Sequence, residues 1–285
     1  MPRLQRFLVA GIPQHVVQRG IDRQAVFFDS SDYEHYLELV FASAESYQLS
    51  VHAYCLMTNH IHLLVTPHEK AALPRMMQRL GSNYVRFINQ RYRRSGTLWD
   101  GRYRASLVES DDYFLTCQRY IELNPLRAKM VVRPEEYPWS SYHRNALGTE
   151  DRRVTLHEVY LELGGDESVR RAAYRSLFSG ALGDEELSAI RSALEHNHVL
   201  GSERFRRQVE IMLAHKVGTG RVGRPRKSEP ARMTVRRSSS ARKRCRRKRC
   251  RSRNDPVGGA LKRLTSGWNP HSSCIHKEVD MPRLH

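Results

Sequence analysis

The sequence predicts an α+β fold, in which a ferredoxin-like split βαβ antiparallel sheet carries helices on one face and is followed by a small helical extension and a disordered basic tail. Over the first 110 residues the hydrophobic period switches between two and about 3.6, in the order strand, helix, two strands, helix, strand. Beyond residue 151 only helical periods remain. Residues 221–254 contain few apolar side chains to offset the entropy of ordering. We therefore expect three regions, at residues 1–147, 148–220 and 221–285.

The first strand and the first helix are expected within residues 15–46. Residues 15–20 (HVVQRG) are rich in β-branched side chains and lead into a turn-like Gly-Ile-Asp, which indicates a strand. Residues 31–34 (SDYE) resemble a capping box at the start of a helix. The apolar side chains of that helix recur at intervals of three or four: Tyr33, Tyr36, Leu37, Val40, Phe41 and Ala44.

A strand pair follows, joined by a turn at Thr58 and Asn59. Its second strand alternates over residues 61–65 and ends at Pro67. One face of its first strand is expected to carry Val51, Ala53, Cys55 and Met57.

Later elements are predicted in the same way. The apolar period indicates a helix over residues 73–88, residues 101–109 (GRYRASLVE) a fourth strand, and Ser110 the start of a third helix. That helix should end at Asn124, because a residue before proline disfavours the helical backbone. The extension is expected to hold short amphipathic helices over residues 155–163, 168–177, 184–196 and 202–215.

The formal net charge of +18 lies almost entirely in the C-terminal part. Residues 1–215 carry 27 basic and 26 acidic side chains, whereas residues 216–285 carry 21 and 4. This asymmetry favours a polyanionic partner, with nucleic acid ahead of an anionic membrane surface. No apolar run approaches the roughly 20 residues that span a bilayer. Five scattered cysteines favour the reducing cytoplasm over a disulfide framework.

Two motifs could carry chemistry. On a strand His60 and His62 project from one face, so their neutral imidazoles could grip a divalent cation, although a surface histidine pair would show the same spacing. On the third helix Tyr120 and Asn124 lie one turn apart and could face one point, the phenol as nucleophile and the amide as an oxygen ligand. Ordinary packing is the alternative for Tyr120.

A basic and aromatic stretch lies between these motifs, from Arg75 to Arg104, and contains one acidic residue, Asp100. Arginines that follow phosphates beside aromatics that stack on bases suit single-stranded nucleic acid, and a solvated helix face is the alternative. The nucleic-acid-binding candidates here are Arg86, Arg91, Arg93, Arg94, Arg102 and Arg104.

Several ordered segments carry a resemblance to one family. They are GIPQHVVQRGIDRQAVFFD, HAYCLMTNHIHLLVTP, YVRFINQRYRRSGTLWDGRYRASLV and YFLTCQRYIELNPLRAKMV, with PWSSY after them. Over about residues 7–147 the chain resembles the single-tyrosine HUH transposases, and among them the REP-associated tyrosine transposases, which are insertion sequence 200-like. Residues 199–205 (VLGSERF) of the extension are also similar to members of this group.

The resemblance implies a function and a role for each motif. His60, His62 and Asn124 match the residues that hold a catalytic Mg²⁺ or Mn²⁺, and Tyr120 matches the nucleophile. Enzymes of this family cut single-stranded DNA near hairpins, in REP-like or element-end sequences, leave a 5′-phosphotyrosine and a free 3′-hydroxyl, and rejoin the ends without ATP. Residues 1–147 would then be the catalytic domain. The tyrosine could act in cis or, in a homodimer, in trans.

The tail adds a second DNA-binding motif. Residues 221–227 (RVGRPRK) resemble an AT-hook, in which an extended arginine pair enters a narrow minor groove, and a generic basic linker is the alternative. Its candidate contacts are Arg224, Arg226 and Lys227. We expect a cytoplasmic, nucleoid-associated enzyme without a membrane partner. A non-catalytic, domesticated nucleic-acid-binding protein is the main alternative, and a hydrolase that uses water is a weaker one.

Overall fold

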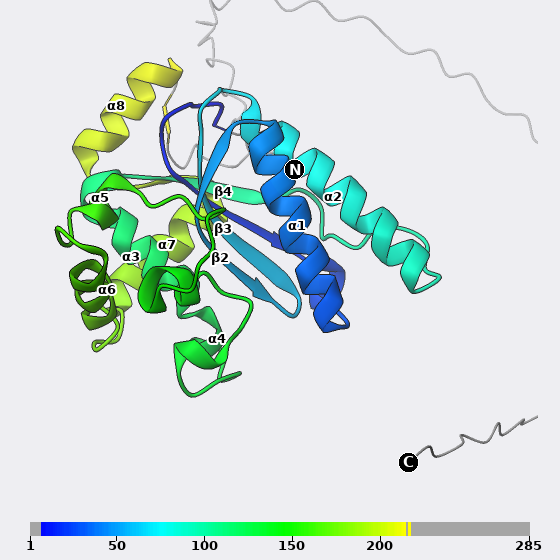
Figure 1. Cartoon of the computed structure of the whole chain (residues 1–285). Helices are drawn as coiled ribbons and strands as arrows, with labels where there is room; N and C mark the ends of the chain where they lie inside the picture. The colour runs from blue at the N-terminus through cyan, green and yellow to red at the C-terminus, as the bar shows by residue number, and fades with distance from the viewer. Residues whose placement is uncertain (1–6, 215, 218–285) are drawn as a thin grey trace, which may run out of the picture. The chain divides into compact units, whose positions relative to one another are not determined.

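The computed structural model describes residues 7–214, 216 and 217, which form a sheet with helices on both faces (Figure 1). Its strands are β1 (Gln14–Arg19), β2 (Leu49–Met57), β3 (His60–Pro67), β4 (Arg104–Val108) and β5 (Val199–Leu200). They lie in the order β2-β3-β1-β4-β5. The first four strands pair antiparallel in the order of a split βαβ sheet, so the predicted α+β fold class is confirmed.

The two helices that connect these strands cover one face, as predicted. They are α1 (Ser30–Ser46) and α2 (Ala72–Arg91). Their apolar stripes pack on Val16, Ile61, Leu63 and Val65 of the strands and form the larger core. The cap of α1 differs from the prediction: Asp29 is the N-cap and shares a capping box with Asp32, so the box predicted over residues 31–34 is wrong.

Helices also cover the opposite face, which the prediction of helices on one face missed. There α3 (Ser110–Glu122) and α7 (Asp184–His196) pack through Phe114, Cys117 and Ile190 on Ala53, Cys55, Met57 and Leu64. A sheet whose strands are apolar on both faces must be covered twice, and the nearly continuous burial of β2 and β3 carries this signal. The smaller helices are α4 (Asn124–Arg127), α5 (Glu158–Leu161), α6 (Glu167–Ser176) and α8 (Glu203–Leu213).

Two irregularities of the sheet were not predicted. A β-bulge between Val51 and Ala53 shifts the register of β2, so Val51 joins the α1/α2 core while Ala53, Cys55 and Met57 face α3. The predicted common face for all four residues is therefore wrong at Val51. The strand β5, only two residues long, pairs parallel to β4, so the sheet is not wholly antiparallel. Such a short strand has no measurable hydrophobic period.

A buried carboxylate connects α3 to the helical extension. Glu122 is 1% exposed and accepts hydrogen bonds from Ser141 (2.6 Å), Asn145 (2.8 Å) and Tyr174 of α6 (2.8 Å). Burial raises the pKa of Glu122 to about 7, although the three hydrogen bonds favour its charged form.

None of the helices in the described part of the chain is long and apolar enough to cross a bilayer.

Glu122→Gln is expected to flatten the pH dependence of stability. Because the pKa of Glu122 is higher in the folded chain than in the unfolded one, its contribution is complete below about pH 4.5 and is lost as the pH rises through about 7. The loss is on the order of 3 kcal/mol. Urea unfolding of the wild type and of Glu122→Gln at pH 5 and pH 8 measures this loss. If the free energy of unfolding changed equally with pH in both proteins, the raised pKa of Glu122 would be contradicted.

Candidate active site

The register of β1 and β3 builds one wall of the site. Arg19 lies opposite His60, and Val17 lies opposite His62, so these four side chains share one sheet face. Ile61 points to the other face and packs under α1 and α2. The predicted common face of the two histidines is what the strand geometry shows.

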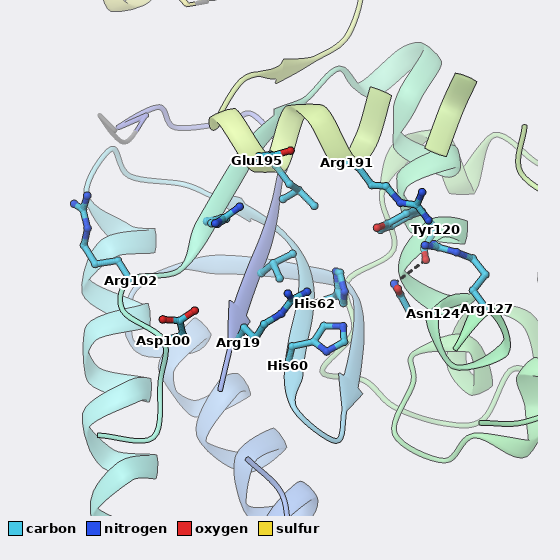
Figure 2. Close-up of a pocket in the computed structure, with 13 residues that line it drawn as sticks. Arg19, His60, His62, Asp100, Arg102, Tyr120, Asn124, Arg127, Arg191 and Glu195 are labelled. Atoms are coloured by element: carbon cyan, nitrogen blue, oxygen red, sulfur yellow. Dashed lines mark hydrogen bonds between the residues drawn. The ribbon is translucent and has the colours of Figure 1, made fainter. Parts of the chain in front are cut away.

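The helix α3 brings the tyrosine to this wall. The ring of Tyr120 lies 6.0 Å from that of His62 and 5.7 Å from that of His15, and the rings of His60 and His62 are 5.1 Å apart, centroid to centroid. Asn124 lies at the start of α4 and donates from Nδ2 to the carbonyls of Tyr120 (2.9 Å) and Ile121 (3.2 Å). These bonds hold the amide so that Oδ1, at its other end, is left for another partner (Figure 2).

The two histidines among the three predicted metal ligands are held in their neutral form. Burial, with Arg19 nearby, lowers the pKa of His60 to about 4. Burial also lowers the pKa of His62 far below its usual value, and His15, His60, Arg127 and Arg19 add to this. His60 Nδ1 donates to the Asn59 carboxamide oxygen at 2.6 Å, so its Nε2 carries the lone pair that a cation needs.

A third histidine, which the sequence did not single out, supports His62. Nε2 of His15 lies 2.9 Å from Nδ1 of His62, and the two rings stack with centroids 5.1 Å apart. His15 is fully buried, and its own Nδ1 has no partner in the described part of the chain. If His62 donates from Nδ1, the lone pair on its Nε2 is free for a cation. Strand alternation could have pointed to His15, because His15 and Arg19 lie on the same face of β1 and Arg19 lies opposite His60.

One pocket of about 430 Å³ is lined by His60, His62, Tyr120 and Asn124 (Figure 2). Among the described residues, five arginines line the pocket. Two acidic residues, Asp100 and Glu195, line it as well. Arg102 and Arg104 were predicted as DNA contacts, whereas sequence reasoning missed Arg19, Arg127 and Arg191. Excess positive charge beside a phenol and two imidazoles suits an anionic ligand such as a phosphodiester.

The sequence of the region around the pocket matches a known family. Residues 9–124 match the family described as "Transposase IS200 like". This segment is therefore similar to the IS200-like transposases. The IS200-like domain runs from the segment before β1 to Asn124, so it contains both pocket histidines, Tyr120 and the asparagine.

Proteins similar to this chain are named as transposases. The chain is 30% identical over 114 residues to a Haemophilus influenzae protein named as a REP-associated tyrosine transposase. The matched region makes up 36% of this chain and 64% of that protein. A solved REP-associated tyrosine transposase bound to a REP hairpin is 13% identical, with a TM-score of 0.43 over 56% of this chain and 93% of that one. A Deinococcus radiodurans chain solved as a transposase is 20% identical, with a TM-score of 0.31 over 43% and 96%.

The other predicted DNA contacts within the described residues do not line this pocket. Arg86 and Arg93 are exposed. Arg91 lies 3.5 Å from the Asp32 carboxylate, and Arg94 stacks on Phe28 at 5.7 Å, so both have partners within the fold. Their contacts with DNA stay a prediction. Arg224, Arg226 and Lys227, with the rest of the predicted tail, lie outside the described residues.

The donor set of the IS200-like domain fits a divalent cation. The described residues contain no group of three or more His, Cys, Asp or Glu side chains that could hold a metal ion. A cation bound by His60 and His62 would therefore need a third ligand of another residue type. Asn124 lines the same pocket and can supply a carboxamide oxygen. Two imidazoles and one amide oxygen form a mixed nitrogen and oxygen site, which suits Mn²⁺ and accommodates Mg²⁺.

Proposed function

We propose that this chain is a DNA transposase that cuts and rejoins single-stranded, hairpin-bearing DNA through a covalent bond to Tyr120. The observation that carries the proposal is the position of Tyr120 beside His62, inside an arginine-rich pocket of an IS200-like domain. Phosphodiester transfer needs a nucleophile and groups that stabilise charge on the phosphate, and Tyr120 and the pocket arginines are groups of these kinds.

The proposed reaction is a transesterification. The Tyr120 oxygen attacks the scissile phosphorus and forms a P–O bond, while the bond from phosphorus to the 3′ oxygen breaks. The phenolic proton leaves to solvent, and the departing oxygen gains a proton as the 3′-hydroxyl. The number of phosphoester bonds is unchanged, so attack by a 3′-hydroxyl on the phosphotyrosine reverses the step without ATP. The pocket arginines hold the phosphate through both steps.

We also propose that His60, His62 and Asn124 hold a divalent cation. When bound, such an ion polarises the phosphate and offsets charge on its oxygens. The chain's own part is to keep both imidazoles neutral through burial, and to hold the Asn124 amide by its bonds to the α3 carbonyls.

His15 is expected to orient His62 toward that ion. His15→Phe keeps an aromatic ring but removes the nitrogen that lies 2.9 Å from His62. Loss of such an outer partner lowers metal affinity by roughly 10- to 100-fold. Titration calorimetry with Mn²⁺ on folded wild-type and His15→Phe protein measures this, with His15→Gln as the variant that retains a polar partner. Equal affinity in all three would show that His15 only packs.

The function itself is tested with a panel of labelled hairpin oligonucleotides incubated with the full chain and Mn²⁺. We expect a covalent protein–DNA species on denaturing gels, and mass spectrometry should place the phosphate on the peptide that contains Tyr120. Absence of this species across hairpins with varied flanking sequences would overturn the proposal. Binding without any adduct would favour the non-catalytic alternative.

A further inference from the structure

We propose that the helical extension completes the active site, because Arg191 of α7 and Arg127 of α4 form a clamp for the scissile phosphate on Tyr120. This inference rests on the proposed function. Both arginines lie beyond residues 9–124, the part of the chain that matches the transposase family. Arg127 lies in the segment YFLTCQRYIELNPLRAKMV, which resembles the REP-associated group, whereas Arg191 lies in the helical extension.

Arg127 supplies one side of the clamp. Its guanidinium carbon lies 4.2 Å from the centroid of the Tyr120 ring. Its Nη1 is buried and has no hydrogen-bond partner in the part of the chain that the structure describes. A buried guanidinium N–H without an acceptor is costly, and an anionic oxygen beside the tyrosine would satisfy it.

Arg191 supplies the other side. One face of α7 lines the pocket. It carries Arg191, Leu194 and Glu195, which recur at helical spacing. The position of this face is fixed, because Ile190, Ala193 and Leu194 pack into the core that also contains Cys117 and Ile121 of α3. Among the described residues Arg191 has neither an ion pair nor a hydrogen bond, and its side chain points toward Tyr120 (Figure 2).

Two arginines on different elements suit a phosphodiester better than one. A guanidinium presents a planar fork of donors, so two forks can approach the two non-bridging oxygens of the phosphate from different sides. The phosphotyrosine formed by cleavage is again a diester with the same single negative charge. The clamp can therefore hold the phosphate on Tyr120 while the 3′ end leaves and another arrives.

The clamp should accelerate the reaction and not merely bind DNA. Charge on the equatorial phosphate oxygens is redistributed at the transition state, and fixed donors aimed at those oxygens stabilise it. Because α7 packs against α3, an extension in its folded position also holds the tyrosine helix against the histidine strand. Arg191 is then a catalytic residue, whereas the apolar residues of α7 position it.

The test combines a protein variant with a change of one phosphate. A methylphosphonate removes the negative charge from a single phosphate, and it is placed at each position along a hairpin oligonucleotide in turn. Binding is measured with the full chain carrying Tyr120→Phe, with or without Arg191→Ala. Arg207→Ala is the matched control, since Arg207 on α8 is exposed and lies 3.9 Å from Glu203.

We expect Arg191→Ala to weaken binding of unmodified DNA by about tenfold, the effect of losing a charge-assisted hydrogen bond. At one methylphosphonate position the same substitution should change affinity less than twofold, because the partner charge is already gone. Arg207→Ala should show no such position. Equal effects of Arg191→Ala at every position, or no effect at all, would overturn the clamp.

A kinetic arm separates this inference from the proposed function. With Tyr120 intact and DNA saturating, Arg191→Ala should slow adduct formation by about 10- to 100-fold, and Arg191→Lys should recover part of the rate through its point charge. An adduct that forms at the wild-type rate in Arg191→Ala would refute the clamp and leave the proposed function standing. If the wild-type chain forms no adduct, the proposed function fails and the binding arm alone decides the clamp.

Discussion

Tyr120→Phe is expected to abolish the covalent adduct while leaving the fold intact. Tyr120 is 5% exposed and is held through its ring, by His15, by His62 and by the guanidinium of Arg127. Among the described residues the Tyr120 hydroxyl has no hydrogen-bond partner, so a phenylalanine keeps the packing and loses only the attacking oxygen. Adduct yield should fall on the order of 10³-fold or more, as it does when other enzymes lose their nucleophile.

The measurement is adduct formation on denaturing gels, with urea unfolding and hairpin binding as controls for fold and affinity. Both controls should match the wild type. Strand cleavage that persists without an adduct would instead favour the hydrolase alternative, in which water attacks. The pocket contains a candidate base for that reaction, since Glu195 lines it beside the arginines.

His60→Ala is the second change with a large expected effect. His60 lies at the start of β3 and is only half-buried, and its Nδ1 bonds the neighbouring Asn59, so truncation leaves no hole in the core. Loss of one of the two imidazoles should reduce Mn²⁺-dependent adduct formation by about 100-fold or more. A Mn²⁺ titration of the adduct rate checks this, and an unchanged rate at limiting metal would contradict His60 as a ligand.

His62→Ala should give a different result, because His62 is 4% exposed and stacks on His15. Its removal opens a cavity and leaves Nε2 of His15 without its partner, which should cost on the order of 2–3 kcal/mol of unfolding free energy. His60→Ala is thus the variant that separates chemistry from stability. A comparison of the two by urea unfolding tests this division.

Much of the fold was predictable from hydrophobic periods alone. The stripe of α2 is confirmed, with Met76, Leu80 and Ile88 fully buried. The alternation of Ile61 and Leu63 against His60 and His62 is confirmed as well. Where prediction failed, the deciding contacts are non-local: a bulge at Val51 flips one residue, and β5 forms only because Val199 and Leu200 meet Leu107 and Val108.

The candidate site divides along the same line. Sequence spacing places His60 beside His62 and Tyr120 one turn from Asn124, since the first pair shares one strand and the second spans only the end of α3 and the start of α4. No local pattern shows that His15 meets His62, because 47 residues separate them, or that α7 brings Arg191 to Tyr120. Charge counts also do not show that Arg91, a predicted DNA contact, lies 3.5 Å from the Asp32 carboxylate.

The sequence by itself determined the α+β class, the paired histidines, the tyrosine with its asparagine, and the basic character that points to a nucleic acid. Only the tertiary structure decided that a second helical layer covers the histidine face. That layer turns a strand motif and a helix motif into one arginine-lined pocket. The physical reason is that periodicity reports which face of an element is buried, whereas the partner that buries it depends on packing between segments far apart in the chain.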